Sequence, residues 1–274
     1  MIQVKARSIV FLSIILCVLA GFSLRQLRRS SLFFIQSIDV VWLDTNISIS
    51  SQVIDESEVK RRIQVPLGKV GLFDVNVKEA EKNLLSFEWA GGEWIRAVKV
   101  KRRFPNSLEV LVALRTPKAL IQSSKHTLRY LDQEGVVFGH PDLKSIANLP
   151  VFFGFIGHPS ETRQAIALIG HWESSVLARS SDISSVYFDS ERGFRILASY
   201  PFKMDEKNHP RVVGVLGNKF RTMIDLGQEI DGRIDQKISV LASVIKYLSE
   251  HSMPVRQIWA EVDKKIVVKT AHGS

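Results

Sequence analysis

The spacing of apolar residues in the first part of the chain predicts a small module of strands and helices. β-branched and aromatic residues gather at 37–43, and apolar residues alternate with polar ones at 94–101 and 108–114, as in half-buried strands. Between these strands, apolar residues three or four apart at 55–63 and 77–87 predict two amphipathic helices. The resulting order of strand, helix, helix and hairpin describes a compact α/β module.

Two local patterns define this module further. Asn76 and, three residues later, Glu79 are typical of a capping box at the start of the second helix. The inward face of that helix is predicted to carry Val77, Ala80, Leu84 and Phe87. A turn at 103–107 joins the two strands of the hairpin. The returning strand places on one face Leu108, Val110, Val112 and Leu114.

After Thr116 and Pro117 the pattern becomes richer in strands. Strands are predicted at 127–131, 135–138, 183–188, 194–198 and 220–226, with two more at 257–262 and 265–270. One helix is predicted over 161–177, with an inward face of Ala165, Ile169, Trp172 and Val176. Another is predicted over 230–248, with an inward face of Ile234, Ile238, Leu241, Ile245 and Leu248. Residues 199–211 contain two prolines and are predicted to form a loop.

The N-terminal residues include an uncharged apolar run at 9–24, with basic residues on both sides. As a helix this run rises about 24 Å, and extending it to residue 27 makes it long enough to cross a bilayer. We therefore predict an uncleaved transmembrane anchor at 9–27, after a short tail of residues 1–8. A cleaved signal peptide and a buried soluble helix are the alternatives. The flanking charges nearly balance, so charge alone does not fix the orientation.

Composition narrows the class of protein. The chain has 274 residues, 45% of them hydrophobic and 24% charged, which excludes a disordered chain. Lys and Arg number 37 against 28 Asp and Glu, and the net charge of +9 suits a protein near nucleic acid or an anionic membrane. Cys17 is the one cysteine, which excludes a disulfide within the chain and a cysteine-based metal cluster.

Candidate catalytic motifs are few. The sequence contains no glycine-rich phosphate loop, no dinucleotide-binding turn and no nucleophile elbow, so no cofactor and no metal are predicted. Ser57 and Lys60 have the Ser-x-x-Lys spacing of an activated serine, but the companion motifs are missing and an exposed helix face is favoured. Basic residues at 60–62 and 101–103 are interpreted as solvated faces, with phosphate binding and attraction to anionic headgroups near the anchor as the alternatives. The chain is therefore interpreted as an interaction protein and not as an enzyme.

The C-terminal residues predict a hairpin whose last strand lies at a sheet edge. Residues 257–262 and 265–270 are joined by a two-residue turn. An unpaired strand edge can accept an added strand from a partner. Lys265 and Lys269 flank the apolar centre of the last strand, as in edges protected against promiscuous pairing. A covered or inert final strand is the alternative.

A series of motifs along the chain resembles the FtsQ/DivIB family of bacterial division proteins. The spacing of the family's signature is carried here by Trp94, Ile95, Val98, Val100, Arg102, Phe104, Pro105 and Leu108. Residues 68–75, 115–119 and 130–138 resemble the family's glycine turn, its Arg-x-Pro-x-Ala link and the strand pair that opens its second domain. Further on, the likeness is carried by Leu149, Pro150, Gly154, Leu226, Gly227 and Val262. Leu114 stands where the family usually has Glu, and residues 88–92 look like an insertion.

The resemblance implies an α+β fold: a transmembrane helix, a small POTRA domain of β-α-α-β-β order at 33–116, and a second domain at 117–270. That second domain is a mixed, mainly antiparallel β domain with two helices, and a tail of residues 271–274 follows it. The implied location is the inner membrane at the division septum, as a single-pass type II protein. Residues 1–8 are then a cytoplasmic tail, and most of the chain lies in the periplasm or outside the cell.

The resemblance also implies a function and its residues. Such a protein is a non-enzymatic divisome scaffold that binds FtsB-like and FtsL-like proteins, with lipid around its anchor and no nucleic acid. In this family the FtsB-like partner adds a strand to the terminal edge. Carried over, that site comprises Trp259, Glu261, Val262, Lys265, Ile266, Val267, Val268 and Lys269. A second docking surface comprises Val98, Lys99, Val100 and Lys101. The alternative function is another anchored or exported POTRA-type adaptor in secretion or transport.

Overall fold

The structure is a computed structural model. The part of the chain that it describes comprises residues 30–43, 54–87, 93–123, 127–141, 148–203, 215–216, 218–228, 234–262 and 265–270. The predicted anchor at 9–27 and the insertion at 88–92 lie outside the described residues. Among the described residues, no helix is long and apolar enough to span a bilayer. The chain divides into a first unit, residues 1–115, and a second unit, residues 116–274.

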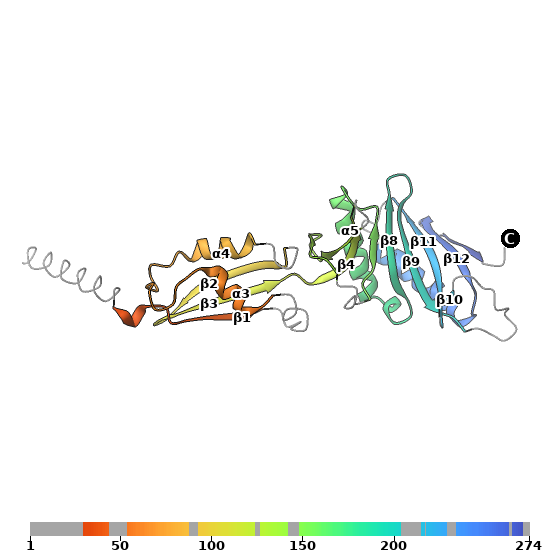
Figure 1. The fold of residues 1–274 in the computed structure, drawn as a ribbon. Coiled ribbons are helices and arrows are strands. Elements are labelled where there is room, and N and C mark those ends of the chain that lie inside the picture. Colours follow the sequence, from red (N-terminus) through yellow and green to blue (C-terminus); the bar gives the residue numbers. More distant parts are fainter. Residues whose placement is uncertain are drawn as a thin grey trace, which may run out of the picture. The chain divides into compact units, whose positions relative to one another are not determined.

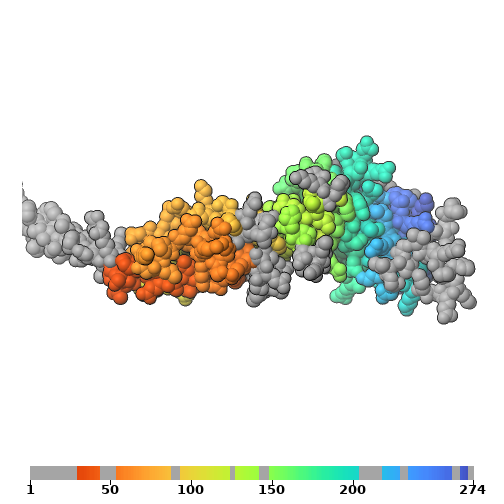
Figure 2. All heavy atoms as spheres, viewed as in Figure 1, coloured from red at the N-terminus to blue at the C-terminus, as the bar shows by residue number. Residues whose placement is uncertain are grey.

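The first unit has the element order β-α-α-β-β after a short 3₁₀ turn (Figure 1). Its elements are η1 (Ser31–Phe33), β1 (Ser37–Trp42), α3 (Glu56–Ile63), α4 (Val77–Leu85), β2 (Ile95–Arg103) and β3 (Ser107–Leu114). The strands form a sheet in the order β1-β3-β2, with β1 parallel and β2 antiparallel to β3. The two helices pack on each other, and they contact the sheet through α3 on β1 and α4 on β2. In Figure 2 the orange surface of this unit comes mostly from the segment that contains these helices.

The predicted helix face and strand face form the core of the first unit. Ala80 and Leu84 of α4 are buried, while Val77 and Phe87 at the two ends of the predicted stripe are half-buried. The predicted face of β3 is buried at Leu108, Val110, Val112 and Leu114. The cap is also present, because the Asn76 side chain accepts a hydrogen bond from the Glu79 amide at 3.3 Å. The pattern of the sequence therefore predicted this core correctly.

The second unit is built on one mixed and mainly antiparallel sheet, which confirms the predicted α+β class. Its strands are β4 (Pro117–Gln122), β5 (Leu128–Asp132), β6 (Val137–Phe138), β7 (Val151–Phe153), β8 (Asp182–Asp189), β9 (Gly193–Pro201), β10 (Val215–Leu216), β11 (Lys219–Gly227), β12 (Val255–Val262) and β13 (Lys265–Thr270). Its helical segments are α5 (Pro159–Ser174), η2 (Val176–Arg179) and α6 (Ile234–Glu250). The sheet order is β13-β12-β11-β9-β8-β7-β4-β5-β6, with β10 beside β11.

Both helices of the second unit pack against one face of this sheet. Along β9 the residues Phe194, Ile196, Ala198 and Tyr200 are fully buried, whereas the residues between them are half-exposed. The helices contribute to the same core through Ala165, Ile169 and Trp172 of α5 and through Ile238, Leu241, Ile245 and Leu248 of α6. The opposite face of the central strands is thus the more exposed one, and Figure 1 shows β8, β9, β11 and β12 side by side.

Gly154 occupies a position where the backbone requires glycine. Its φ is +83°, and a Cβ there would lie 2.2 Å from the carbonyl oxygen of Phe188. The turn after β7 therefore approaches β8 so closely that no side chain fits. This requirement is the physical reason for glycine in the Leu-Pro-x-x-x-Gly motif of the sequence.

Three details of the sequence-based predictions were wrong. Val176 was placed on the inward face of a helix, but α5 ends at Ser174 and Val176 is 69% exposed, while its neighbour Leu177 is buried. The loop predicted at 199–211 begins later, because β9 continues through Pro201. Residues 204–211 of that loop lie outside the described part. Strands β4, β7 and β10 were not predicted.

Candidate partner-binding site

The terminal hairpin lies at one end of the sheet in the second unit. β13 pairs antiparallel with β12, in the register Gln257 with Lys269, Ile258 with Val268 and Trp259 with Val267. Within the described residues, β12 is the one neighbour of β13 in the sheet. The backbone groups on the far side of β13 therefore have no strand partner among those residues, which is the arrangement that accepts an added strand.

The apolar centre of β13 is exposed on both faces. Val267 is 53% exposed and shares the more open face with Trp259, its half-buried partner on β12. Val268 is 39% exposed and lies on the helix side, opposite the fully buried Ile258. Edge strands of soluble proteins usually avoid such exposed β-branched pairs. These two valines are therefore the part of the strand most suited to burial by a partner.

The other residues predicted for this site hold the hairpin or flank it. Ile266 is half-buried and packs against the core of the second unit, and Lys269 is exposed at the end of β13. Glu261, Val262 and Lys265 lie in the two strands. The structure does not describe the side chains of these three residues.

Tyr200 on β9 positions the start of β12. Its hydroxyl donates a hydrogen bond to the Met253 carbonyl oxygen at 2.6 Å and accepts one from the Val255 amide at 3.1 Å. Burial raises the pKa of Tyr200 to about 12, because the ionised form would lose its hydration. Tyr200 was not among the predicted site residues. An isolated tyrosine in a strand gives no signal that it bonds a loop 53 residues away.

β12 is also fixed from its other side. It runs parallel to β11 in the register Met223 with Gln257, Ile224 with Ile258 and Asp225 with Trp259. The Gln257 side-chain amide donates to the Asp225 carboxylate at 2.5 Å on the more open face. The edge hairpin is thus attached to the sheet by a backbone ladder and by a side-chain bond.

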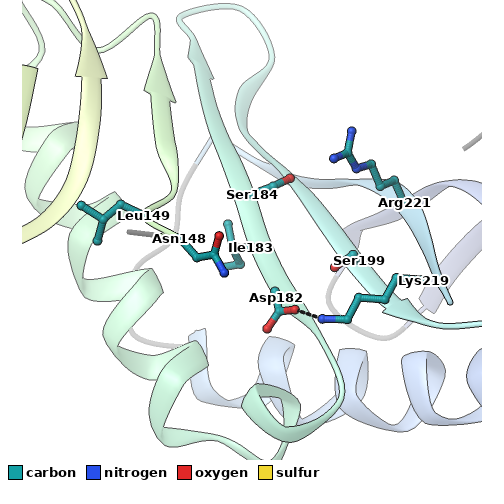
Figure 3. Close-up of a pocket in the computed structure, with 8 residues that line it drawn as sticks. All are labelled: Asn148, Leu149, Asp182, Ile183, Ser184, Ser199, Lys219 and Arg221. Carbon is teal, nitrogen blue, oxygen red and sulfur yellow. Dashed lines mark hydrogen bonds and ion pairs between the residues drawn. The ribbon is translucent and has the colours of Figure 1, made fainter. Parts of the chain in front are cut away.

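A shallow cavity of about 330 Å³ lies elsewhere in the second unit (Figure 3). It is lined by Asn148, Leu149, Asp182, Ile183, Ser184, Ser199, Lys219 and Arg221. Asp182 and Lys219 form an ion pair with each other. The Ser184 hydroxyl donates to the Leu197 carbonyl oxygen at 3.0 Å. The lining residues thus combine hydroxyls with charged side chains, and they include no histidine or cysteine.

The second predicted docking surface lies on β2 of the first unit. Lys99 and Lys101 are exposed there, Val98 is half-buried and Val100 is buried. The Val100 amide donates to a carboxylate oxygen of Glu81 on α4 at 2.8 Å. The outward backbone donor at the centre of this strand is therefore already bonded, and the exposed side chains of this stretch are those of Lys99 and Lys101.

Ser57 and Lys60 bond to different carboxylates. The Ser57 hydroxyl donates to Asp55, the N-cap of α3, at 2.5 Å, and that bond is the main cause that lowers the pKa of Asp55. Lys60 forms an ion pair with Glu56 at 2.6 Å. The interpretation of these residues as an exposed, charged helix face agrees with this geometry.

The sequence was compared with known proteins. No family model matches the chain. A cell division protein FtsQ from Geotalea daltonii (strain DSM 22248 / JCM 15807 / FRC-32) is 26% identical over 162 residues, which cover 54% of this chain and 58% of the relative. One from Geobacter sp. (strain M21) is 25% identical over 188 residues, covering 64% and 59%. One from Anaeromyxobacter sp. (strain K) is 34% identical over 109 residues, covering 36% of each.

These relatives support the FtsQ/DivIB family for this chain. The resemblance found from the motifs is thereby confirmed. The chain spans less than two thirds of the length of the FtsQ proteins that it matches. What those proteins do is therefore carried to this chain below as a proposal.

Proposed function

We propose that this chain is a membrane-anchored, non-enzymatic scaffold of the cell division machinery, and that it binds an FtsB-like protein by strand addition at β13. The observation that carries the proposal is the exposed apolar edge strand at the end of the sheet, with Val267 and Val268 at its centre. The similar proteins also support the proposal, because their names assign them to cell division.

Binding by strand addition divides affinity and specificity between backbone and side chains. The free backbone groups of β13 would bond those of the added strand, and alternate side chains of that strand would face the two sides of the sheet. On the more open side they would meet Val267 and Trp259, and on the other side Val268. The spacing of these contacts would set the register, because a slip of one residue exchanges the two faces.

The remaining expectations of the family form part of the same proposal. The β-α-α-β-β order of the first unit is the order expected of a POTRA domain, with Lys99 and Lys101 as its exposed docking side chains. An anchor at 9–27 would make the chain a single-pass type II protein of the inner membrane, with both units in the periplasm. An FtsL-like protein and other divisome components are the further partners proposed.

Binding of the FtsB-like protein from the same organism tests the edge mechanism. The full chain is held in lipid nanodiscs, and binding is measured for the unchanged chain and for a chain that ends at residue 263. We expect truncation to abolish binding, because it removes β13. Since truncation also exposes β12, Val267→Pro is measured beside it in the full chain. Val267→Thr is its matched control, because threonine keeps the backbone donor and the β-branched shape.

Either of two outcomes would contradict this proposal. Binding that survives truncation would move the site away from β13 while keeping the family. If neither the FtsB-like nor the FtsL-like protein binds, alone or together, the divisome role fails. A different exported adaptor would then be the function to test.

A further inference from the structure

One end of the first unit carries a cluster of three phenylalanines. Phe33 comes from η1, Phe73 from the segment before α4, and Phe104 from the turn between β2 and β3. Their rings contact one another edge to face, with centroid distances of 5.6 Å for Phe33–Phe73, 5.9 Å for Phe33–Phe104 and 5.6 Å for Phe73–Phe104. Figure 1 shows η1 and the β2–β3 turn at the same end of this unit.

Backbone hydrogen bonds make this end a fixed structure. The Leu72 amide donates to the Phe33 carbonyl oxygen at 2.7 Å, and the Gln36 amide donates to that of Asn106 at 2.8 Å. Arg102 adds two side-chain bonds across the same region, to the carbonyl oxygens of Leu72 at 2.8 Å and Val75 at 2.7 Å. The three segments therefore present their side chains as one surface, which we name the aromatic tip.

The aromatic tip exposes large apolar side chains. Leu32 is 68% exposed, Phe104 is 64% exposed and Leu67 is 52% exposed. Leu67 belongs to the same end, because the amide of the next residue, Gly68, donates to the Ile35 carbonyl oxygen at 2.8 Å. Apolar side chains grouped in this way mark a surface that something covers.

The sequence before the tip indicates what covers it. The uncharged apolar run at 9–24 ends seven residues before Ser31, and that connection spans at most about 25 Å when fully extended. Arg25, Arg28 and Arg29 lie within the connection. If the run crosses a bilayer, the tip lies within reach of its headgroups.

The charges on the tip suit an anionic membrane surface. Lys69 and Arg103 are exposed beside the apolar residues. Arg103 also forms an ion pair with Glu109 at 3.5 Å, and Asp74 is the exposed acidic residue of the neighbouring segment. Apolar side chains with basic neighbours are typical of protein surfaces that lie in the boundary between headgroups and acyl chains.

We propose that the aromatic tip, formed by Leu32, Phe33, Leu67, Phe73 and Phe104, inserts into the headgroup region of the membrane that holds the N-terminal anchor. The aromatic tip then holds the first unit at the lipid surface, as a second contact besides the anchor. This inference rests on the proposed anchor, and it does not depend on strand addition at β13.

A fluorescent label on the tip tests this contact in the full chain. Cys17→Ser removes the native thiol, and Phe104→Cys carries an environment-sensitive dye in nanodiscs that contain anionic lipid. The matched control is Leu85→Cys on α4, which is also exposed, at 43%, and lies away from the tip. We expect a blue-shifted emission and strong quenching by a lipid-attached quencher for the label at 104, and neither for the label at 85. Leu32→Cys repeats the test at a second exposed position.

The possible failures are distinguishable. A chain that enters the nanodisc but gives equal, weak quenching at 104, 32 and 85 overturns the tip contact and leaves the anchor standing. A chain that does not enter the nanodisc overturns the anchor and, with it, this inference. Binding of the FtsB-like protein to the same samples reports on β13 separately.

Discussion

A single hydroxyl group connects the core of the second unit to the hairpin at the end of its sheet. The Tyr200 hydroxyl bonds both the Met253 carbonyl oxygen and the Val255 amide, and these groups precede and begin β12. Tyr200→Phe removes both bonds without changing the packing of the ring. We expect the free energy of unfolding of the second unit to fall by about 1–3 kcal/mol at neutral pH, because two buried backbone groups lose their partner. Denaturant unfolding followed by circular dichroism measures this difference.

Tyr200 also predicts that the folded protein loses stability at alkaline pH. The pKa of Tyr200 is raised to about 12 in the folded state by burial, so the folded protein holds this proton more tightly than the unfolded chain does. The contribution of protonated Tyr200 to the stability of the fold is present below pH 10 and is lost as the pH rises toward 12. We expect the unchanged chain to lose about 2 kcal/mol more than Tyr200→Phe over this interval. Parallel pH profiles for the two proteins would contradict the assignment.

The edge strand offers a pair of matched substitutions. Successive residues of a strand direct their amides to opposite sides, so one of Val267 and Val268 bonds β12 and the other faces outward. Proline removes the amide donor in either case. We expect Val267→Pro to abolish binding of the FtsB-like protein while leaving the first unit folded. Val268→Pro removes the neighbouring amide, which faces the opposite side of the strand. Comparing the two variants shows which substitution also weakens the hairpin.

Calorimetric titration together with circular dichroism separates these effects. The informative variant is the one that keeps its hairpin, because it lacks only an outward donor. Full binding by that variant would rule out strand addition at the centre of β13.

In the first unit, the Glu81 carboxylate accepts a hydrogen bond from the Val100 amide on β2. Glu81→Ala leaves the Val100 amide without its acceptor, and we expect a loss of about 1 kcal/mol in the stability of the first unit. Glu81→Gln keeps a side-chain oxygen and serves as the control, with a smaller loss. Thermal unfolding of both variants measures the difference, and equal stability of Glu81→Ala and the unchanged chain would show that water replaces the carboxylate.

Helices and strands were predicted correctly from the sequence where a regular spacing of apolar residues matches the buried face of the element. The faces of α4, β3 and α6 follow from periodicity, since Leu84, Val110 and Leu241 each lie on an apolar stripe and are fully buried. β7 was missed because three residues are too few to show a period, and β4 because Pro117 was interpreted as a boundary. The Tyr200 and Glu81 contacts depend on which segments meet in space, and local patterns do not contain that information.

For the whole chain, we expect the two units to have separate stabilities. Leu84 and Ile245 are both fully buried, one in each unit. Replacing either by alanine should cost about 2–5 kcal/mol, because it leaves a cavity in a packed core. Native-state hydrogen exchange should show faster exchange in residues 54–114 for Leu84→Ala and in residues 117–270 for Ile245→Ala. An equal effect of either variant on both units would indicate one cooperative domain.

Hydrogen exchange on the partner complex tests strand addition at β13 most directly. The full chain in nanodiscs is mixed with the FtsB-like protein, and amide exchange is followed for every described strand. We predict strong protection of outward amides within 265–270 and little change at 98–101, because among the described strands β13 is paired on one side alone, while the Val100 amide is already bonded. Formation of the complex with no new protection in β13 would contradict the mechanism.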